Sequence, residues 1–89
     1  MQVTVEVSLY PLTENFESVV IEYIEEIKKT PSFEIFVNGL STQIIGEYEL
    51  VMSTLNKINK ETFEKYKCVI LMKMASGEKT IDNLPEILK

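Results

Sequence analysis

The feature that most constrains the fold of this chain is the order of its hydrophobic patterns, in which strand-like alternation and helix-like spacing follow one another. Residues 2–10 alternate between apolar and other side chains, which is the pattern of a half-buried strand. One parity holds Val3, Val5, Val7 and Leu9, and the other holds Thr4, Glu6, Ser8 and Tyr10. Pro11 has no N–H to donate to a ladder, so we expect the strand to end there.

A helical period comes next. Apolar residues recur at spacings of three and four, at Phe16, Val19, Val20, Ile24 and Ile27. The preceding residues 13–15 offer N-cap candidates, and Pro31 disfavours helical geometry at the residue before it. The sequence therefore predicts a helix that begins near residue 16 and ends at residue 30.

A hairpin and a second helix follow. Residues 33–37 and 41–45 predict two strands, and Asn38-Gly39 between them predicts a tight hairpin with positive φ at both centres. We expect Gly46 to open the second helix. The apolar stripe of that helix contains Tyr48, Val51, Met52, Leu55, Ile58 and Thr62.

The last predicted strand spans residues 66–74. Its apolar run over 68–72 is nearly continuous, which suggests burial on both faces. A turn is expected at 76–79, and a short terminal helix at 81–88 is interrupted by Pro85.

The element order β-α-β-β-α-β predicts one α+β domain over residues 1–89 with a ferredoxin-like fold. In this arrangement a four-stranded antiparallel sheet carries two helices on one face. The other face is left open, and the apolar last strand suggests that a second subunit covers it. We therefore expect a homo-oligomer, a dimer or a tetramer.

Composition excludes several classes of function. The net charge is −5, and the nine basic residues include no arginine, so nucleic acid and anionic membranes are poor partners. The absence of histidine removes the commonest general base and metal ligand. A single cysteine, Cys68, suits a reducing compartment. With no signal peptide and no long apolar segment evident in the sequence, we expect a cytoplasmic protein.

Catalysis is also disfavoured. Ser8, Ser41 and Thr42 have no histidine to activate them, and nothing places Lys73 beside a serine. The loop after the first strand lacks the Cys-x-x-Cys of a metal carrier. We therefore expect a binding protein rather than an enzyme.

Polar residues from neighbouring strands form the candidate site. The first and third strands are the central pair of a ferredoxin-like sheet, so their hydroxyl, amide and carboxylate groups can cluster and bind a polar heteroaromatic ligand. The candidates are Glu6, Ser8, Tyr10, Asn38, Ser41, Thr42 and Gln43. A simpler explanation stands beside this one. Ser41 and Thr42 can merely cap the hairpin, and Glu6 can be a solvated charge.

Two segments carry a family resemblance. Residues 7–12, Val-Ser-Leu-Tyr-Pro-Leu, and residues 40–48, Leu-Ser-Thr-Gln-Ile-Ile-Gly-Glu-Tyr, are followed by a strand that ends before Gly77-Glu78. Together they resemble the YkoF-like thiamine-binding family over nearly the whole chain. The resemblance implies a ferredoxin-like fold, non-catalytic binding of thiamine or its hydroxymethylpyrimidine half, and association of domains through their sheets. Because this chain holds one such domain, self-association would replace a fused partner.

The implied ligand has two chemical parts. Its aminopyrimidine edge suits Ser8, Ser41, Thr42 or Gln43 as hydrogen-bond partners. Its cationic thiazolium suits the carboxylates of Glu6 and Glu47 or the faces of Tyr10 and Tyr48.

Because Glu47 and Glu49 occupy the start of the second helix, we predict a preference for unphosphorylated ligands. No cofactor beyond this ligand is expected. Uptake, salvage or buffering of thiamine is the predicted role. The alternatives are a structural or regulatory interaction module without a small-molecule ligand, and a small enzyme of thiamine metabolism.

Overall fold

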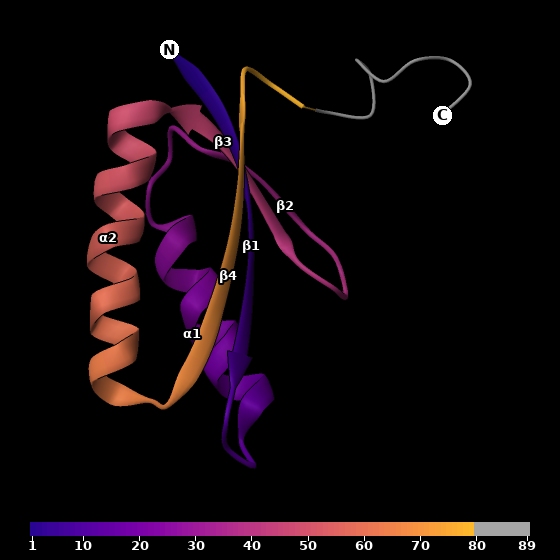
Figure 1. The fold of residues 1–89 in the computed structure, drawn as a ribbon, viewed down its shortest axis with the longest axis vertical. Coiled ribbons are helices and arrows are strands. Elements are labelled where there is room, and N and C mark those ends of the chain that lie inside the picture. The colour runs from indigo at the N-terminus through magenta and orange to yellow at the C-terminus, as the bar shows by residue number, and fades with distance from the viewer. Residues whose placement is uncertain (80–89) are drawn as a thin grey trace.

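The computed structural model describes residues 1–79, and the predicted terminal helix at 81–88 lies outside the described residues. The elements are β1 (Gln2–Pro11), α1 (Phe16–Lys28), β2 (Glu34–Val37), β3 (Thr42–Glu47), α2 (Tyr48–Lys65) and β4 (Cys68–Ser76). The sheet order is β2-β3-β1-β4, and every pair is antiparallel. Both helices lie on one side of the sheet (Figure 1). These features confirm the predicted ferredoxin-like α+β fold.

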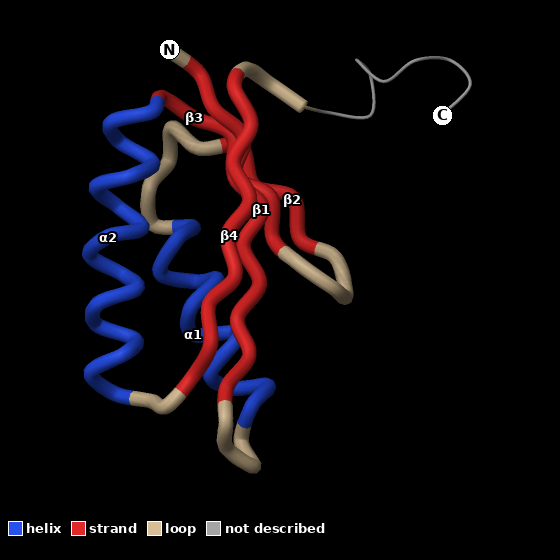
Figure 2. The backbone as a smooth tube through the Cα atoms, viewed as in Figure 1, coloured by secondary structure: helices blue, strands red, loops and turns tan. Residues whose placement is uncertain are grey.

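The two helices face the same side of the sheet (Figure 2), and the residues of the core come from these helices, from the sheet and from Phe33 between them. Val3, Val5 and Val7 of β1 are each at most 4% exposed, which confirms the predicted parity of that strand. The helices bury Ile27 and Leu55 against them. Alternation in the strands and helical spacing in the helices therefore place the core as elementary geometry requires.

The apolar stripe of α1 is wider than the core needs. Its buried residues are Val19, Tyr23 and Ile27. Phe16, which the sequence placed in the core stripe, is 53% exposed, and Ile21 is 55% exposed. These two side chains form a second apolar face at the beginning of the helix.

Gly46 belongs to β3 and does not open the second helix, contrary to the prediction. A Cβ at this position would lie 2.7 Å from Phe33 Cδ1 and 3.0 Å from Val51 Cγ2. The glycine is therefore required by the close approach of two core side chains. The helix begins at Tyr48, directly after the strand.

The hairpin between β2 and β3 also differs from the prediction. Within residues 1–79 the one residue with positive φ is Gly77, so Asn38-Gly39 does not form the predicted turn. The Asn38 N–H donates to Ser41 O at 3.0 Å, which leaves Gly39 and Leu40 at the turn. Asn38 Oδ1 accepts from the N–H groups of Leu40 (2.8 Å) and Ser41 (3.0 Å). This side-chain bonding stabilises the turn without positive φ.

The outer face of β4 is open in the single chain. Ile70 and Met72 pack against the core, whereas Val69 and Leu71 point to the other face and are 53% and 54% exposed. The apolar run of β4 is therefore not buried on both faces by its own chain. The predicted turn after β4 is present, with Gly77 at φ 77° and its N–H donating to Gln2 O at 2.9 Å.

Candidate binding site

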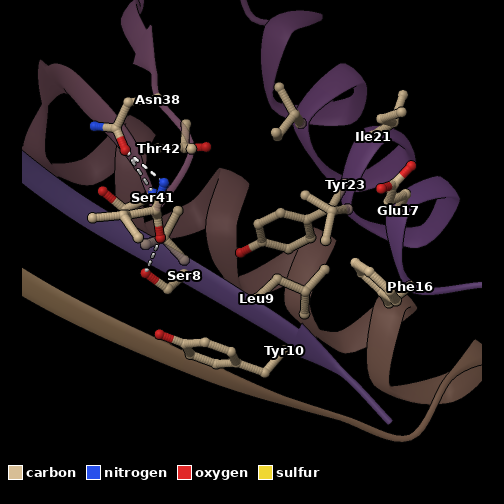
Figure 3. A pocket seen from close by; sticks show the side chains of 15 residues that line it. Ser8, Leu9, Tyr10, Phe16, Glu17, Ile21, Tyr23, Asn38, Ser41 and Thr42 are labelled. Atoms are coloured by element: carbon tan, nitrogen blue, oxygen red, sulfur yellow. Dashed lines mark hydrogen bonds between the residues drawn. The ribbon is translucent and has the colours of Figure 1, made fainter. Parts of the chain in front are cut away.

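A difference in strand length creates a pocket. β1 pairs with β3 from Gln2 to Val7 but with β4 from Val3 to Pro11. Beyond the pair of Val7 with Thr42, the chain turns into the loop 38–41 and leaves one edge of β1 without a strand. A pocket of about 510 Å³ lies between this edge, the loop and the first turns of α1 (Figure 3).

The walls of the pocket are mainly apolar. Val7, Leu9, Val20, Tyr23 and Ile24 line it from β1 and α1. Exposed large hydrophobic side chains also line it, and they are Tyr10, Phe16, Ile21 and Leu40. Apolar walls with a few polar groups are typical of sites for small organic molecules.

The hydroxyl of Thr42 is the most informative polar group in the pocket. Thr42 is 5% exposed, and its Oγ1 has no hydrogen-bond partner within residues 1–79. Every fully buried side-chain oxygen in residues 1–79 has a hydrogen-bond partner. The Thr42 oxygen has none, so it is not fully buried and keeps contact with solvent. Because Thr42 lines the pocket, we infer that the pocket supplies that contact and that the hydroxyl is available to a ligand there.

Two serines hold the loop 38–41 against β1. Ser8 Oγ donates to Leu40 O at 3.3 Å (Figure 3), and Ser41 Oγ donates to Glu6 Oε2 at 3.1 Å. Glu6 in turn lies 3.9 Å from Lys73 Nζ. These contacts give the two serine hydroxyls a structural role, and each retains lone pairs that can accept a further bond.

The structure brings together most of the predicted site residues. Those that line the pocket are Ser8, Tyr10, Asn38, Ser41 and Thr42. Glu6 is one hydrogen bond away, through Ser41. Gln43 pairs with Glu6 on the open face of the sheet and does not line the pocket.

Glu47 lies at the far end of β3, roughly 17 Å from Thr42 at about 3.4 Å per residue. It is the N-cap of α2, where its Oε2 accepts from the N–H of Leu50 at 3.0 Å. This backbone hydrogen bond lowers the pKa of the Glu47 carboxyl. The acidic start of α2 is therefore a helix cap and does not contribute to the pocket.

No direct signal in the sequence marks the α1 wall of the pocket, which includes Glu17, Val20 and Tyr23. The excess width of the apolar stripe was the available clue. Tyr23 donates its hydroxyl to Asn59 Oδ1 at 2.5 Å, and burial raises the pKa of its phenol far above the ordinary value. Tyr23 is thus a neutral structural group, whereas Glu17 is the acidic side chain among the lining residues of the described range 1–79.

Residues 1–79 contain no group of three histidine, cysteine or acidic residues placed to hold a metal ion. None of the helices in that range is long and apolar enough to cross a membrane. Burial raises the pKa of the Cys68 thiol, which is not among the lining residues of the pocket.

No protein-family model and no curated protein sequence matches this chain. Solved structures do match it. One is a Thermotoga maritima protein provisionally assigned to thiamine biosynthesis or salvage, with a TM-score of 0.78, 22% identity and 92% of each chain covered.

A Streptococcus pneumoniae protein matches with a TM-score of 0.80 and 19% identity over 99% of this chain and 98% of that one. The domain of unknown function DUF77 from Bacillus cereus matches at 0.73 and 22%, over 92% and 85% of the two chains. At these identities the likeness establishes the fold, and membership of the YkoF-like family stays a prediction.

Proposed function

We propose that this protein binds thiamine or its hydroxymethylpyrimidine half in the pocket beside the free edge of β1, without catalysing a reaction. The observation that carries the proposal is the hydroxyl of Thr42, which has no hydrogen-bond partner within residues 1–79, on a residue that is 5% exposed and lines a pocket with apolar walls. The provisional thiamine assignment of the Thermotoga maritima neighbour and the resemblance of residues 7–12 and 40–48 to thiamine-binding proteins support the choice of ligand.

The chemistry of the pocket fits both halves of thiamine. A pyrimidine ring has apolar faces, which suit Val20 and Ile24, and a polar edge, which suits the Thr42 hydroxyl. The thiazolium carries a permanent positive charge. The carboxylate of Glu17 and the ring of Tyr10 offer that cation an ion pair and an aromatic face.

A binding protein without a reaction would hold the vitamin or deliver it, so we propose a role in thiamine uptake, salvage or buffering. The unpaired Cys68 suits a reducing compartment, and we propose that this role is cytoplasmic.

Thermal unfolding tests the proposal directly. A ligand that binds only the native state stabilises it by about 2.7 kcal/mol at a concentration one hundred times its Kd. We expect thiamine, hydroxymethylpyrimidine or both to raise the Tm. A Tm that neither ligand raises at millimolar concentration would contradict the proposal.

The same assay tests the preference for unphosphorylated ligands. The reason differs from the one inferred from sequence, because Glu47 lies far from the pocket. Among residues 1–79 no lysine lines the pocket, whereas Glu17 does, so the phosphates would meet negative charge. We expect thiamine diphosphate to bind at least about tenfold more weakly than thiamine, or ~1.4 kcal/mol. Tighter binding of the diphosphate would be the opposing result.

The open face of the sheet supports a second proposal, self-association. By register, β1 and β4 present Tyr10 opposite Val69 and Ser8 opposite Leu71 on this face. Tyr10, Val69 and Leu71 are each more than half exposed. Glu6 and Lys73 lie 3.9 Å apart on the same face and offset each other's charge. An apolar face without net charge at its centre favours a second copy of the chain as its partner.

A further inference from the structure

The free edge of β1 carries backbone groups that no strand uses. In an antiparallel sheet, the N–H and C=O of one residue point to the same side, and successive residues alternate between the two sides. The Leu12 N–H donates to Lys67 O, and the Gly77 N–H donates to Gln2 O, both at 2.9 Å and both on the β4 side. The even-numbered residues of β1 therefore direct their backbone groups to β4, and the odd-numbered ones direct them to β3.

Leu9 is the first odd-numbered residue beyond the end of β3. Val7 pairs with Thr42, which is the last pair between these two strands. Leu9 pairs only with Ile70, on the other side. By the same alternation its N–H and C=O face the side where the ladder with β3 would have continued, and Leu9 is among the residues that line the pocket there.

Pro11 determines which partner this edge can accept. It is the next odd-numbered residue of β1, and it has no N–H. An added peptide strand would find one donor, that of Leu9, and could not continue the ladder. The edge therefore suits a small planar ligand better than a peptide.

We propose that the backbone of Leu9 recognises the polar edge of the aminopyrimidine. The N–H donates to a ring nitrogen, and the C=O accepts from the neighbouring exocyclic amino group. The donor and acceptor of one residue lie side by side, as do the two complementary groups of the ligand. This inference rests on the proposed function and names the group that selects an amino-substituted ring.

Leu9→Pro tests the inference by removing the donor. No ladder bond is lost on that side, and Leu9→Val keeps the N–H as the matched control for the altered side chain, which packs against the core. Calorimetry with 4-amino-5-hydroxymethyl-2-methylpyrimidine should show about tenfold weaker binding for Leu9→Pro than for Leu9→Val. The analogue with hydrogen in place of the amino group should bind the native protein about tenfold more weakly than the amino compound.

Amide hydrogen exchange tests the same point in the native protein, and it decides the matter if Leu9→Pro does not fold. The Leu9 amide should exchange faster than the Val7 amide in the free protein and become protected by saturating pyrimidine. Protection of Leu9 equal to that of Val7 without ligand, or no change on saturation, would overturn the inference.

The outcomes separate the two levels of the proposal. If neither the native protein nor Leu9→Val binds the pyrimidine or thiamine, the proposed function fails, and the inference fails with it. If the native protein, Leu9→Val and folded Leu9→Pro bind equally, the recognition by Leu9 fails while the proposed function stands.

Discussion

Gly46 and Asn38 lie near the opposite ends of β3, and both help to fix where that strand runs. Gly46 admits the Phe33 ring to a position 2.7 Å from where a Cβ would be. Asn38 closes the turn with its side-chain oxygen. The position of the pocket is set by where the pairing of β3 with β1 stops, so the pocket depends on both residues.

Gly46→Ala should destabilise the fold. The new methyl group overlaps Phe33 and touches Val51, and overpacking of a core typically costs about 1–3 kcal/mol. Gly39→Ala is the matched control, since apart from its chain neighbours no residue comes within 4 Å of its Cβ position and its φ is not positive. Urea unfolding measures both variants. Equal free energies of unfolding for the two would contradict the packing role of Gly46.

The residue types at positions 38 and 46 predicted a turn and a break in structure there, but they did not predict the contacts that these residues make. A glycine between a strand and a helix is compatible with a helix start and with a close contact inside the strand. The approach of Phe33 distinguishes the two, and it is a tertiary contact that local sequence does not contain. Likewise Glu47 was predicted at the ligand, whereas its carboxylate caps α2.

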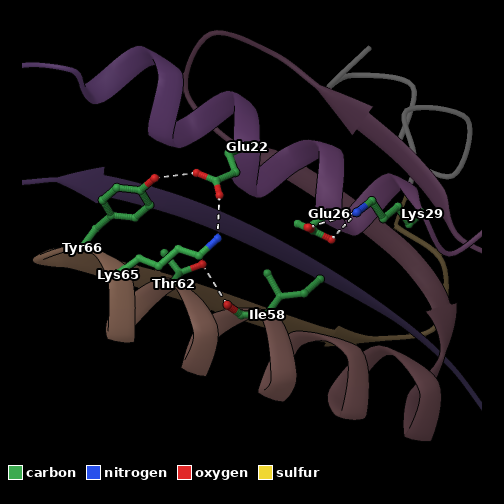
Figure 4. A network of polar contacts seen from close by, with 7 residues as sticks. All are labelled: Glu22, Glu26, Lys29, Ile58, Thr62, Lys65 and Tyr66. Atoms are coloured by element: carbon green, nitrogen blue, oxygen red, sulfur yellow. Dashed lines mark hydrogen bonds and ion pairs between the residues drawn. The ribbon is translucent and has the colours of Figure 1, made fainter.

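At the scale of elements, α1 and α2 are tied together by a polar cluster (Figure 4). Glu22 accepts from the Tyr66 hydroxyl at 2.7 Å and from Lys65 Nζ at 2.9 Å. The hydrogen bond from Tyr66, followed by that from Lys65, lowers the pKa of the Glu22 carboxyl. The cluster joins α1 to the C-terminal end of α2, and α1 forms one wall of the pocket.

The cluster predicts a pH dependence. Because the folded-state pKa of Glu22 is lowered, its stabilising contribution is present above the ordinary pKa of 4.5 and is lost as the pH falls through the folded value. Glu22→Gln should therefore lose less stability than the native protein between pH 6 and pH 2, by a small amount because the cluster is exposed to solvent. Denaturant unfolding at several pH values measures this.

Glu25→Gln provides the control for loss of charge alone, since Glu25 is an exposed glutamate of the same helix. Identical pH profiles for Glu22→Gln and the native protein would show that the cluster does not couple to folding.

The helices and strands could be predicted from the spacing of hydrophobic residues, because burying one face of an element imposes a regular spacing on its apolar side chains. The role of the second apolar face of α1 could not be predicted in this way. Its residues Phe16 and Ile21 are apolar, and they adjoin the core stripe in the helical projection. Composition does not distinguish a side chain that packs in the core from one that lines a pocket.

At the scale of the whole molecule, the sheet has one covered face and one open face. The topology was predictable because the element order β-α-β-β-α-β admits few arrangements. The pocket was not, since it arises from the pairing registers of β1 with β3 and with β4, which end four residues apart on β1, at Val7 and Pro11.

The proposed self-association predicts that Leu71→Lys yields a monomer. A lysine in the apolar part of the face, opposite Ser8, would have to be desolvated on pairing. Phe63→Lys is the control, because Phe63 is similarly exposed, at 55%, but lies on α2, away from the open face. Sedimentation velocity distinguishes the species. A native protein that sediments as a monomer at high concentration would refute the proposal.

Calorimetry on three proteins tests most directly whether the pocket beside the first residue of β3, Thr42, binds thiamine or hydroxymethylpyrimidine. Thr42→Val removes the pocket hydroxyl with little change in shape, whereas Thr42→Ser retains it. We predict that the native protein and Thr42→Ser bind the ligand, and that Thr42→Val binds about tenfold more weakly. Equal binding by all three, or binding by none, would contradict the account.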